Sequence, residues 1–237
     1  MPDLSEQTVL ITGAAQGLGA SIARVFGRQG ARLVLMDIDG RGLTAVANSI
    51  DGTVETIAVD LADAVATEVS ITQISGPVDT LIHNAAILKP KPMEAESLSS
   101  FRATLDVGIQ AAFQLTQSVW PGMKARGGGA LIFVSSQSGI KGFVDETAYC
   151  AAKHALEGFS KCLALEGAAH GIVSCTIRPG KAMHTPMSQR NYPPELKAEW
   201  IDPERLAPAF IKVATQRDMA LSGQRLNAWT MSEQEAA

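Results

Sequence analysis

Residues 8–19 read TVLITGAAQGLG, an apolar run followed at once by a glycine-rich turn. Thr8–Ile11 has the apolar character of a buried strand, and a helical pattern begins at Gly17. Glycines let the chain turn tightly and bring backbone N–H groups close to a ligand. Because a helix N-terminus carries partial positive charge, a strand, turn and helix in this order indicate a pyrophosphate site. Glycine-rich turns also occur in nucleotide-dependent methyltransferases and in plain tight turns.

The rest of the chain alternates between short apolar runs and longer segments of helical period. The expected strands are 8–11, 32–36, 56–59, 78–82, 130–134, 172–177 and 224–228. The expected helices are 17–29, 41–50, 63–74, 97–125, 147–169 and 203–215. Strict alternation with continuously apolar strands predicts a parallel sheet with helices on both faces. We therefore expect an α/β, Rossmann-like, doubly wound sheet of about seven strands in a three-layer sandwich.

Composition and charge narrow the class of protein. The 237 residues are 46% hydrophobic and 19% charged, without an internal repeat or linker, so we expect one domain over 1–237. Its one long irregular segment, 180–202, is the expected substrate lid. No apolar run is long enough to form a membrane-spanning helix, and the acidic N-terminus does not resemble a signal peptide. A net charge of −4 without a basic stripe argues against nucleic acid. Three unpaired cysteines predict a reducing, cytoplasmic setting and no metal site.

Two acidic residues follow expected strands. Asp37 stands about twenty residues after the glycine-rich turn, the spacing of a carboxylate that binds an adenosine ribose. Such a carboxylate would repel a 2′-phosphate, so NAD(H) is favoured over NADP(H). The alternative is a helix N-cap, a role that Asp39 fills equally well. Asp60 is expected either to reach the adenine or to cap the next helix.

Tyr149 and Lys153 stand four residues apart within an expected helix, with Ser136 thirteen residues before the tyrosine. Residues at this spacing lie on one face of a helix, so the ammonium can favour an ionised phenol. A phenol with a pKa near 10 is only about 0.1% ionised at pH 7, and a tyrosine poised near neutrality needs roughly 4 kcal/mol from its surroundings. Alone, the pair is more often a core tyrosine beside a solvated lysine.

Taken together, these motifs resemble the short-chain dehydrogenase/reductase family, from Thr8 to about Ala228. In chain order they are Thr12-Gly13 to Gly17-x-Gly19, Asp37, Asp60-Leu61, Asn84-Ala85-Ala86, Ser136, Tyr149-x-x-x-Lys153 and Pro179-Gly180. The resemblance implies a seven-stranded sheet in a homotetramer or dimer built from two long helices. We expect those helices within 97–125 and 147–169, which are apolar around much of their circumference.

The resemblance also implies a role for each motif residue. Ser136 would hydrogen-bond the substrate oxygen, Tyr149 would be the general acid/base, and Lys153 would bind the nicotinamide ribose and lower the tyrosine pKa. The implied cofactor-binding residues are Gly13, Gln16, Gly17, Leu18, Gly19, Asp37, Asp60, Leu61, Asn84, Ala85, Ala86, Tyr149, Lys153, Pro179, Gly180 and Thr185.

Three positions depart from the family pattern. Gly108 stands where an asparagine is usual, which predicts an altered proton relay because the side chain that fixes the local helix distortion is missing. Ala86 replaces a glycine near the adenosine, and four residues rather than three separate Gly180 from Thr185.

The leading hypothesis is therefore an NAD(H)-dependent alcohol dehydrogenase or carbonyl reductase that acts on a small secondary alcohol or ketone. The alternative is a nucleotide-binding sensor or scaffold of the same family with weak catalysis, which Gly108 motivates. Lys89, Lys91 and Arg190 give only a weak indication of an anionic substrate, since each is more often a solvated side chain.

Overall fold

The computed structural model describes residues 3–235. It contains one seven-stranded parallel sheet in the order β3-β2-β1-β4-β5-β6-β7. The strands are β1 (Thr8–Thr12), β2 (Arg32–Asp37), β3 (Val54–Ala58), β4 (Thr80–His83), β5 (Gly129–Val134), β6 (Ile172–Arg178) and β7 (Arg225–Asn227). Each lies within a few residues of its predicted range, and the doubly wound α/β class is confirmed.

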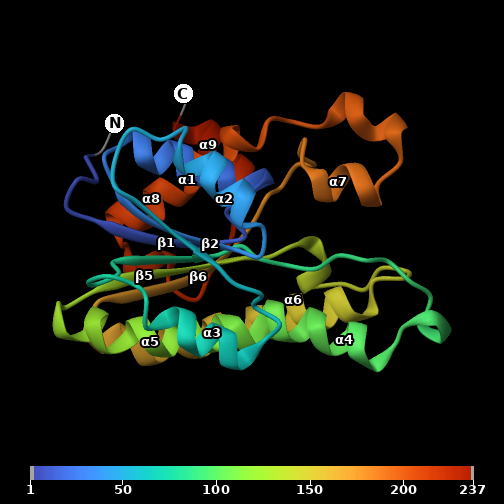
Figure 1. Cartoon of the computed structure of the whole chain (residues 1–237), viewed down its shortest axis with the longest axis horizontal. Helices are drawn as coiled ribbons and strands as arrows, with labels where there is room; N and C mark the ends of the chain where they lie inside the picture. Colours follow the sequence, from blue (N-terminus) through green and yellow to red (C-terminus); the bar gives the residue numbers. More distant parts are fainter. Residues whose placement is uncertain (1–2, 236–237) are drawn as a thin grey trace.

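Helices cover both faces of the sheet (Figure 1). One layer holds α1 (Gly17–Arg28), α2 (Gly40–Ala47), α8 (Ala207–Gln216) and α9 (Ala228–Glu235). The other holds α3 (Ala64–Ile71), α4 (Leu98–Leu105), α5 (Ala111–Ala125) and α6 (Thr147–Gly167). Strand order reverses between β1 and β4, so the fold opens its ligand crevice at the carboxyl ends of these strands.

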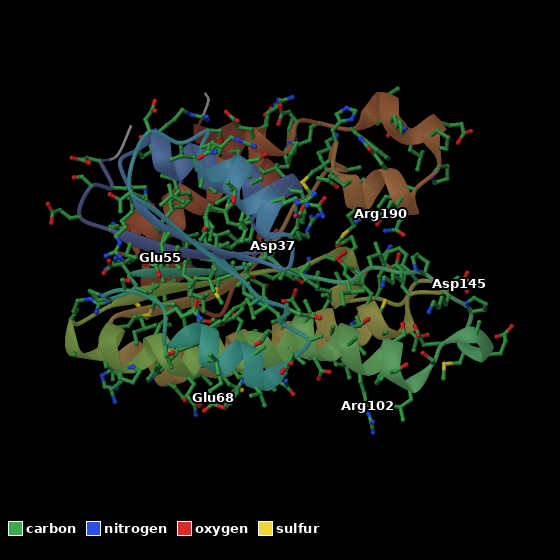
Figure 2. The ribbon with its side chains drawn as sticks, in the orientation of Figure 1. Asp37, Glu55, Glu68, Arg102, Asp145 and Arg190 are labelled. Carbon is green, nitrogen blue, oxygen red and sulfur yellow. The ribbon has the colours of Figure 1, made fainter. Side chains whose placement is uncertain are left out.

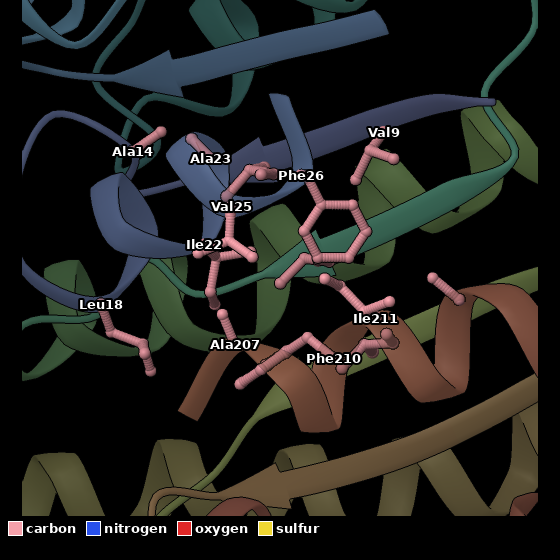
Figure 3. Packing of buried hydrophobic residues seen from close by; sticks show 14 of the residues in the cluster. Val9, Ala14, Leu18, Ile22, Ala23, Val25, Phe26, Ala207, Phe210 and Ile211 are labelled. Carbon is pink, nitrogen blue, oxygen red and sulfur yellow. The ribbon is translucent and has the colours of Figure 1, made fainter. Parts of the chain in front are cut away.

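Two apolar cores hold the three layers together. In the first, Phe26 of α1 and Phe210 of α8 are fully buried against β1 (Figure 3). In the second, Leu115 of α5 and Leu156 of α6 pack on the opposite face with Phe133 of β5. Burial of each such side chain contributes about 1.5–3 kcal/mol. These cores fix the strand ends, and the site is built on those ends.

The predicted helix over 97–125 is interrupted, which is one departure from expectation. A π turn over Asp106–Gln110 separates α4 from α5. Gly108 lies in this turn, and a Cβ at this position would come within 2.8 Å of the Ala152 Cβ on α6. The local distortion thus exists without an asparagine, and the glycine lets the π turn pack closely on α6.

Two C-terminal segments also differ from expectation. Residues 180–202, the predicted lid, are not irregular, because they contain α7 (Pro186–Asn191) and a 3₁₀ helix at Pro194–Glu199. After β7 the chain forms α9, which the sequence pattern did not predict. No helix within residues 3–235 is long and apolar enough to cross a bilayer.

Candidate functional site

A single cleft of about 660 Å³ brings the predicted site residues together at the carboxyl ends of the strands. It is lined by Ser136 and by every predicted cofactor residue except Gly19. The exception has a steric cause, since a Cβ at Gly19 would lie 2.2 Å from the Gly13 carbonyl oxygen. Gly19 therefore lets α1 pack against the glycine-rich turn and does not face the cleft.

The glycine-rich turn is held in a shape that only glycine adopts readily. Gly13 and Gly17 have φ values of +64° and +57°. The Asn84 amide donates to the carbonyls of Thr12 and Gly13 at 3.1 and 3.0 Å, which ties the turn to the end of β4. Gln16, the N-cap of α1, makes no side-chain cap hydrogen bond. The first N–H groups of α1 are thus available to an anion such as a pyrophosphate.

Asp37, at the end of β2, lines the cleft and also anchors the turn. One carboxylate oxygen accepts the Ala15 N–H and the other accepts the Asp39 N–H, both at 3.0 Å. The N-cap of α2 is Asp39, which accepts the Gly42 N–H. The helix-cap alternative for Asp37 is therefore wrong. The bond to Ala15 was not predicted, because it depends on how closely β2 approaches the turn.

Asp60 has a local role as well as a place in the cleft. It accepts the Ala62 N–H at 2.9 Å, whereas Asp63 caps α3 through the N–H groups of Val65 and Ala66. The capping alternative for Asp60 is therefore wrong, and both Asp60 and Leu61 line the cleft.

His83 is a buried residue that the sequence analysis missed. Its Nδ1 lies 3.1 Å from the Thr12 Oγ1, and its Nε2 lies 3.0 Å from the Val107 carbonyl oxygen. The Thr12 hydroxyl already accepts the N–H groups of Asn84 and Ala85, so its proton points to Nδ1. His83 Nε2 then carries the ring proton and donates it to Val107. These hydrogen bonds from Thr12 through His83 to Val107 link the glycine-rich turn to the π turn that contains Gly108. A polar residue ending an apolar strand was the only signal in the sequence.

Burial lowers the pKa of His83 to about 3, and the charge of Lys153 acts in the same direction. The unfolded chain binds this proton near pH 6.5, and the native protein binds it only near pH 3. Between these values the unfolded state holds more protons, so His83 makes the protein less stable as the pH falls.

We expect the free energy of unfolding to lose about 2 kcal/mol from this residue between pH 7 and pH 5. His83→Asn removes this titrating group. Between pH 7 and pH 5, the free energy of unfolding of the variant, measured with urea, should therefore fall by about 2 kcal/mol less than that of the wild type. The control is His154→Asn, on an exposed side chain of α6. Equal pH dependence in the wild type and His83→Asn would contradict a buried, neutral His83.

Ser136, Tyr149 and Lys153 meet on one wall of the cleft. Ser136 follows β5 and its hydroxyl accepts the Ser138 N–H at 3.2 Å. Tyr149 and Lys153 stand one turn apart on α6, with the Lys153 Nζ 5.5 Å from the centroid of the tyrosine ring. Lys153 is 2% exposed and donates to the Val134 carbonyl at 2.7 Å. The predicted triad is therefore spatially contiguous.

Lys153 was expected to lower the pKa of Tyr149, but in this structure the pKa of the phenol is raised. Burial raises the pKa of Tyr149, Tyr192 and Glu146 raise it further, and the hydrogen bond with Ser136 lowers it. Burial also lowers the pKa of Lys153 to about 8, against the opposing effect of Glu157, so the ammonium predominates at pH 7. The protein alone thus keeps Tyr149 protonated, the state required of a proton donor.

Glu157 lies one further turn along α6 and hydrogen-bonds to residues that support this wall of the cleft. Its carboxylate accepts hydrogen bonds from the hydroxyls of Ser135 and Thr176 at 2.5 and 2.8 Å, and from the Arg225 Nε at 3.0 Å. Arg225, on the edge strand β7, also donates to the Ser136 carbonyl at 2.7 Å. This buried network fixes the backbone that carries Ser136. The sequence signal was a glutamate at i+4 from Lys153, which the prediction did not use.

Pro179, Gly180 and Thr185 close the far side of the cleft. Gly180 has a φ of +82°, and a Cβ there would overlap the Asn227 side chain at 1.9 Å. The Trp229 N–H of α9 donates to the Pro179 carbonyl at 3.0 Å, so the C-terminal helix supports this loop. Thr185 is buried, lines the cleft and caps α7.

Among residues 3–235, no group of three His, Cys, Asp or Glu side chains could hold a metal ion.

Comparisons with known proteins agree with this geometry. Residues 7–195 match the family model described as short chain dehydrogenase. The chain is 34% identical to bovine L-xylulose reductase over 203 residues, 85% of this chain and 79% of that protein. It is 32% identical to D-threitol dehydrogenase of Mycolicibacterium smegmatis over 182 residues, 74% of this chain and 70% of that protein.

A solved structure from Beutenbergia cavernae, described as a candidate NAD(P)-dependent gluconate 5-dehydrogenase, has NADP bound at low occupancy. It superposes with a TM-score of 0.87 at 27% identity and covers 96% of this chain and 98% of its own. The family binds NAD(P)(H) and oxidises alcohols or reduces ketones. The chain belongs to the short-chain dehydrogenase/reductase family of oxidoreductases.

Proposed function

We propose that this protein is an NAD(H)-dependent oxidoreductase that interconverts a secondary alcohol and a ketone, with Tyr149 as the general acid/base. One observation carries the proposal: Ser136, Tyr149 and Lys153 share a single cleft with the glycine-rich turn. A group that binds a pyrophosphate at that turn can extend along the cleft to the triad, where a substrate carbonyl would sit.

The glycine-rich turn is suited to the pyrophosphate of a dinucleotide. A Cβ at Gly13 would fall 2.8 Å from the Asn84 amide, so the turn depends on a bare backbone beside α1. We propose that the start of α1 holds the pyrophosphate, that Asp37 holds the adenosine ribose, and that Lys153 holds the nicotinamide ribose. The nicotinamide, when bound, supplies the hydride donor or acceptor.

Residues of this chain would then donate and accept the proton. Ser136 would orient the substrate oxygen, and Tyr149 would donate a proton to it during reduction or accept one during oxidation. Because burial raises the pKa of Tyr149, this phenol is suited to donation; oxidation needs added positive charge beside it. Lys153 and the oxidised nicotinamide are the two sources of that charge in this proposal.

The substrate class is proposed from the relatives together with the lining of the cleft. L-xylulose reductase and D-threitol dehydrogenase are named for a sugar and a polyol. The cleft offers matching polar groups beside the triad, including Ser138, Glu146 and Tyr192. We therefore propose a small polyol and its ketose as the substrate pair.

The preference for NAD(H) rests on the Asp37 carboxylate, because a second negative charge beside it would be repelled. A cytoplasmic enzyme and a homodimer or homotetramer remain predictions. An interface on α5 and α6 is supported by Phe113 and Leu165, which are 49% and 82% exposed.

The alternative is a nucleotide-binding sensor or scaffold with weak turnover, which is motivated by Gly108 at the position of the family's usual asparagine. The two hypotheses differ in one experiment, in which NADH binding is titrated by fluorescence and NADH oxidation is then followed with a panel of ketones and ketoses. Our proposal predicts both binding and turnover. Tight NADH binding with no turnover of any panel member would favour the sensor.

A further inference from the structure

We infer that Ser138, Glu146 and Tyr192 form a hydroxyl-binding subsite that selects neutral, polyhydroxylated substrates and excludes carboxylates. This inference rests on the proposed function and defines which ketones the cleft accepts. All three residues line the cleft, and the charges of Glu146 and Tyr192 act on Tyr149. None of them belongs to the predicted catalytic or cofactor-binding set.

The subsite is continuous with the triad through hydroxyl groups. The Ser136 hydroxyl lies 3.3 Å from the Ser138 hydroxyl, and the Ser138 hydroxyl donates to Glu146 Oε2 at 2.8 Å. Glu146 is therefore two hydrogen bonds from the serine that would hold the reacting oxygen. A substrate whose carbonyl lies at Ser136 places its neighbouring carbons beside Ser138 and Glu146.

Glu146 is held in place by its backbone and not by helix capping. It is the N-cap of α6 but makes no side-chain cap hydrogen bond, so its carboxylate is left to Ser138 and the cleft. The preceding Asp145 has a φ of +65°, in the left-handed region that costs a non-glycine residue energy. The Lys91 N–H donates to the Asp145 carbonyl at 2.7 Å and stabilises this turn. The strained turn directs Glu146 toward the site.

Tyr192 approaches the same place from the lid. It follows α7 directly, and the neighbouring Asn191 amide donates to the Leu88 carbonyl at 3.1 Å, which ties the end of α7 to the opposite wall. Burial and the charge of Glu146 both raise the pKa of Tyr192, and Tyr192 in turn acts on Tyr149. The second phenol therefore lies within electrostatic range of both residues.

These groups suit alcohol hydroxyls better than carboxylates. An ionised carboxylate accepts short, strong hydrogen bonds from hydroxyl donors, and the serine and phenol can donate or accept. A carboxylate on the substrate would face Glu146 across a partly buried site, where like charges repel more strongly than in water. A ketone without hydroxyls would leave these polar groups unpaired, which also costs binding energy.

The cations that line the cleft are Lys153, Arg178, Lys181 and Arg190. Lys153 is buried, donates to the Val134 carbonyl and is proposed to hold the nicotinamide ribose, and Arg178 is partly buried, whereas Lys181 and Arg190 are exposed. Arg190 comes from α7 and is labelled above Asp145 at the right of the view (Figure 2). Solvent and salt screen such exposed charges. Glu146, by contrast, is partly buried and hydrogen-bonded beside the triad.

Three four-carbon ketones test the inference, because they differ mainly in polarity: erythrulose, 2-butanone and acetoacetate. With NADH and the wild-type protein, we expect kcat/KM to be highest for erythrulose and at least about tenfold lower for each of the others. Glu146→Gln keeps the size of the side chain and removes its charge, so the erythrulose-to-acetoacetate ratio should fall about tenfold or more. The matched control is Glu68→Gln, on exposed α3 far from Asp145 and Arg190 (Figure 2), which should leave every ratio unchanged.

The ratio of kcat/KM for erythrulose to kcat/KM for acetoacetate separates substrate selection from catalysis. Any effect of Glu146 on Tyr149 changes the turnover of all three ketones together and leaves this ratio unchanged. Acetoacetate reduced as well as erythrulose, or a ratio unchanged in Glu146→Gln, would overturn the inference while the proposed function stands. Failure of the wild type to reduce any ketone, despite binding NADH, would remove the proposed function and the subsite with it.

Discussion

Tyr149→Phe should reduce the turnover of any ketone by about a thousandfold, the scale of a lost general acid. The substitution removes only the phenol oxygen. The ring remains beside Lys153, whose Nζ lies 5.5 Å from its centroid, and the hydrogen bond from Lys153 to Val134 is untouched. The Kd for NADH should therefore change less than about twofold, and the loss should appear in kcat.

The chain's second tyrosine provides the matched control. Tyr192→Phe removes a phenol from the same cleft, at the proposed hydroxyl subsite, and should raise the KM for a polyhydroxylated ketone with much less effect on kcat. Stopped-flow and steady-state assays at pH 7 measure both variants. Substantial activity in Tyr149→Phe would mean that another group supplies the proton.

Asp37→Ala is the second large effect that we expect, and it concerns cofactor choice. The wild type should bind NADH more tightly than NADPH, because the carboxylate accepts ribose hydroxyls and repels a 2′-phosphate. Alanine should weaken NADH binding about tenfold, a change of about 1.4 kcal/mol, and bring the two affinities together. Part of the loss will come from the turn, since Asp37 also accepts the Ala15 N–H at 3.0 Å.

Asp37→Asn separates these two contributions. The amide keeps an oxygen that can accept the Ala15 N–H, but it carries no charge. The gain in NADPH affinity should therefore persist in Asp37→Asn, with less damage to the turn. Asp51→Asn, on an exposed turn after α2, is the control. An unchanged NADH-to-NADPH preference in both Asp37 variants would contradict the ribose assignment.

The sheet could be predicted from the sequence because its signals are local. Runs such as Val9–Ile11 and Leu131–Val134 are apolar throughout, and every strand of the structure overlaps its expected range. Parallel pairing follows from the helices between the strands. The π turn at Gly108 could not be predicted, because it depends on how closely the turn approaches Ala152 on another helix.

The residues of the cleft could be predicted because their spacing follows the strand ends. The groups that support them could not, since their partners are distant in sequence. His83 bonds to Val107, 24 residues away, and Arg225 reaches Ser136 from 89 residues away. The pKa of Tyr149 likewise depends on burial, which spacing on one helix does not reveal. Motif spacing identified the cleft, and tertiary packing determines its electrostatics.

Transfer of deuterium from NADH tests the central claim most directly. The two forms of NADH labelled at either face of C4 are each mixed with the wild-type protein and erythrulose, and the product is analysed by mass spectrometry after a single turnover. We expect one labelled form to place one deuterium on the carbinol carbon and the other to place none, with no transfer by Tyr149→Phe on the same timescale. Bound NADH that delivers no deuterium to any ketone would contradict a hydride-transferring enzyme and leave a nucleotide-binding protein.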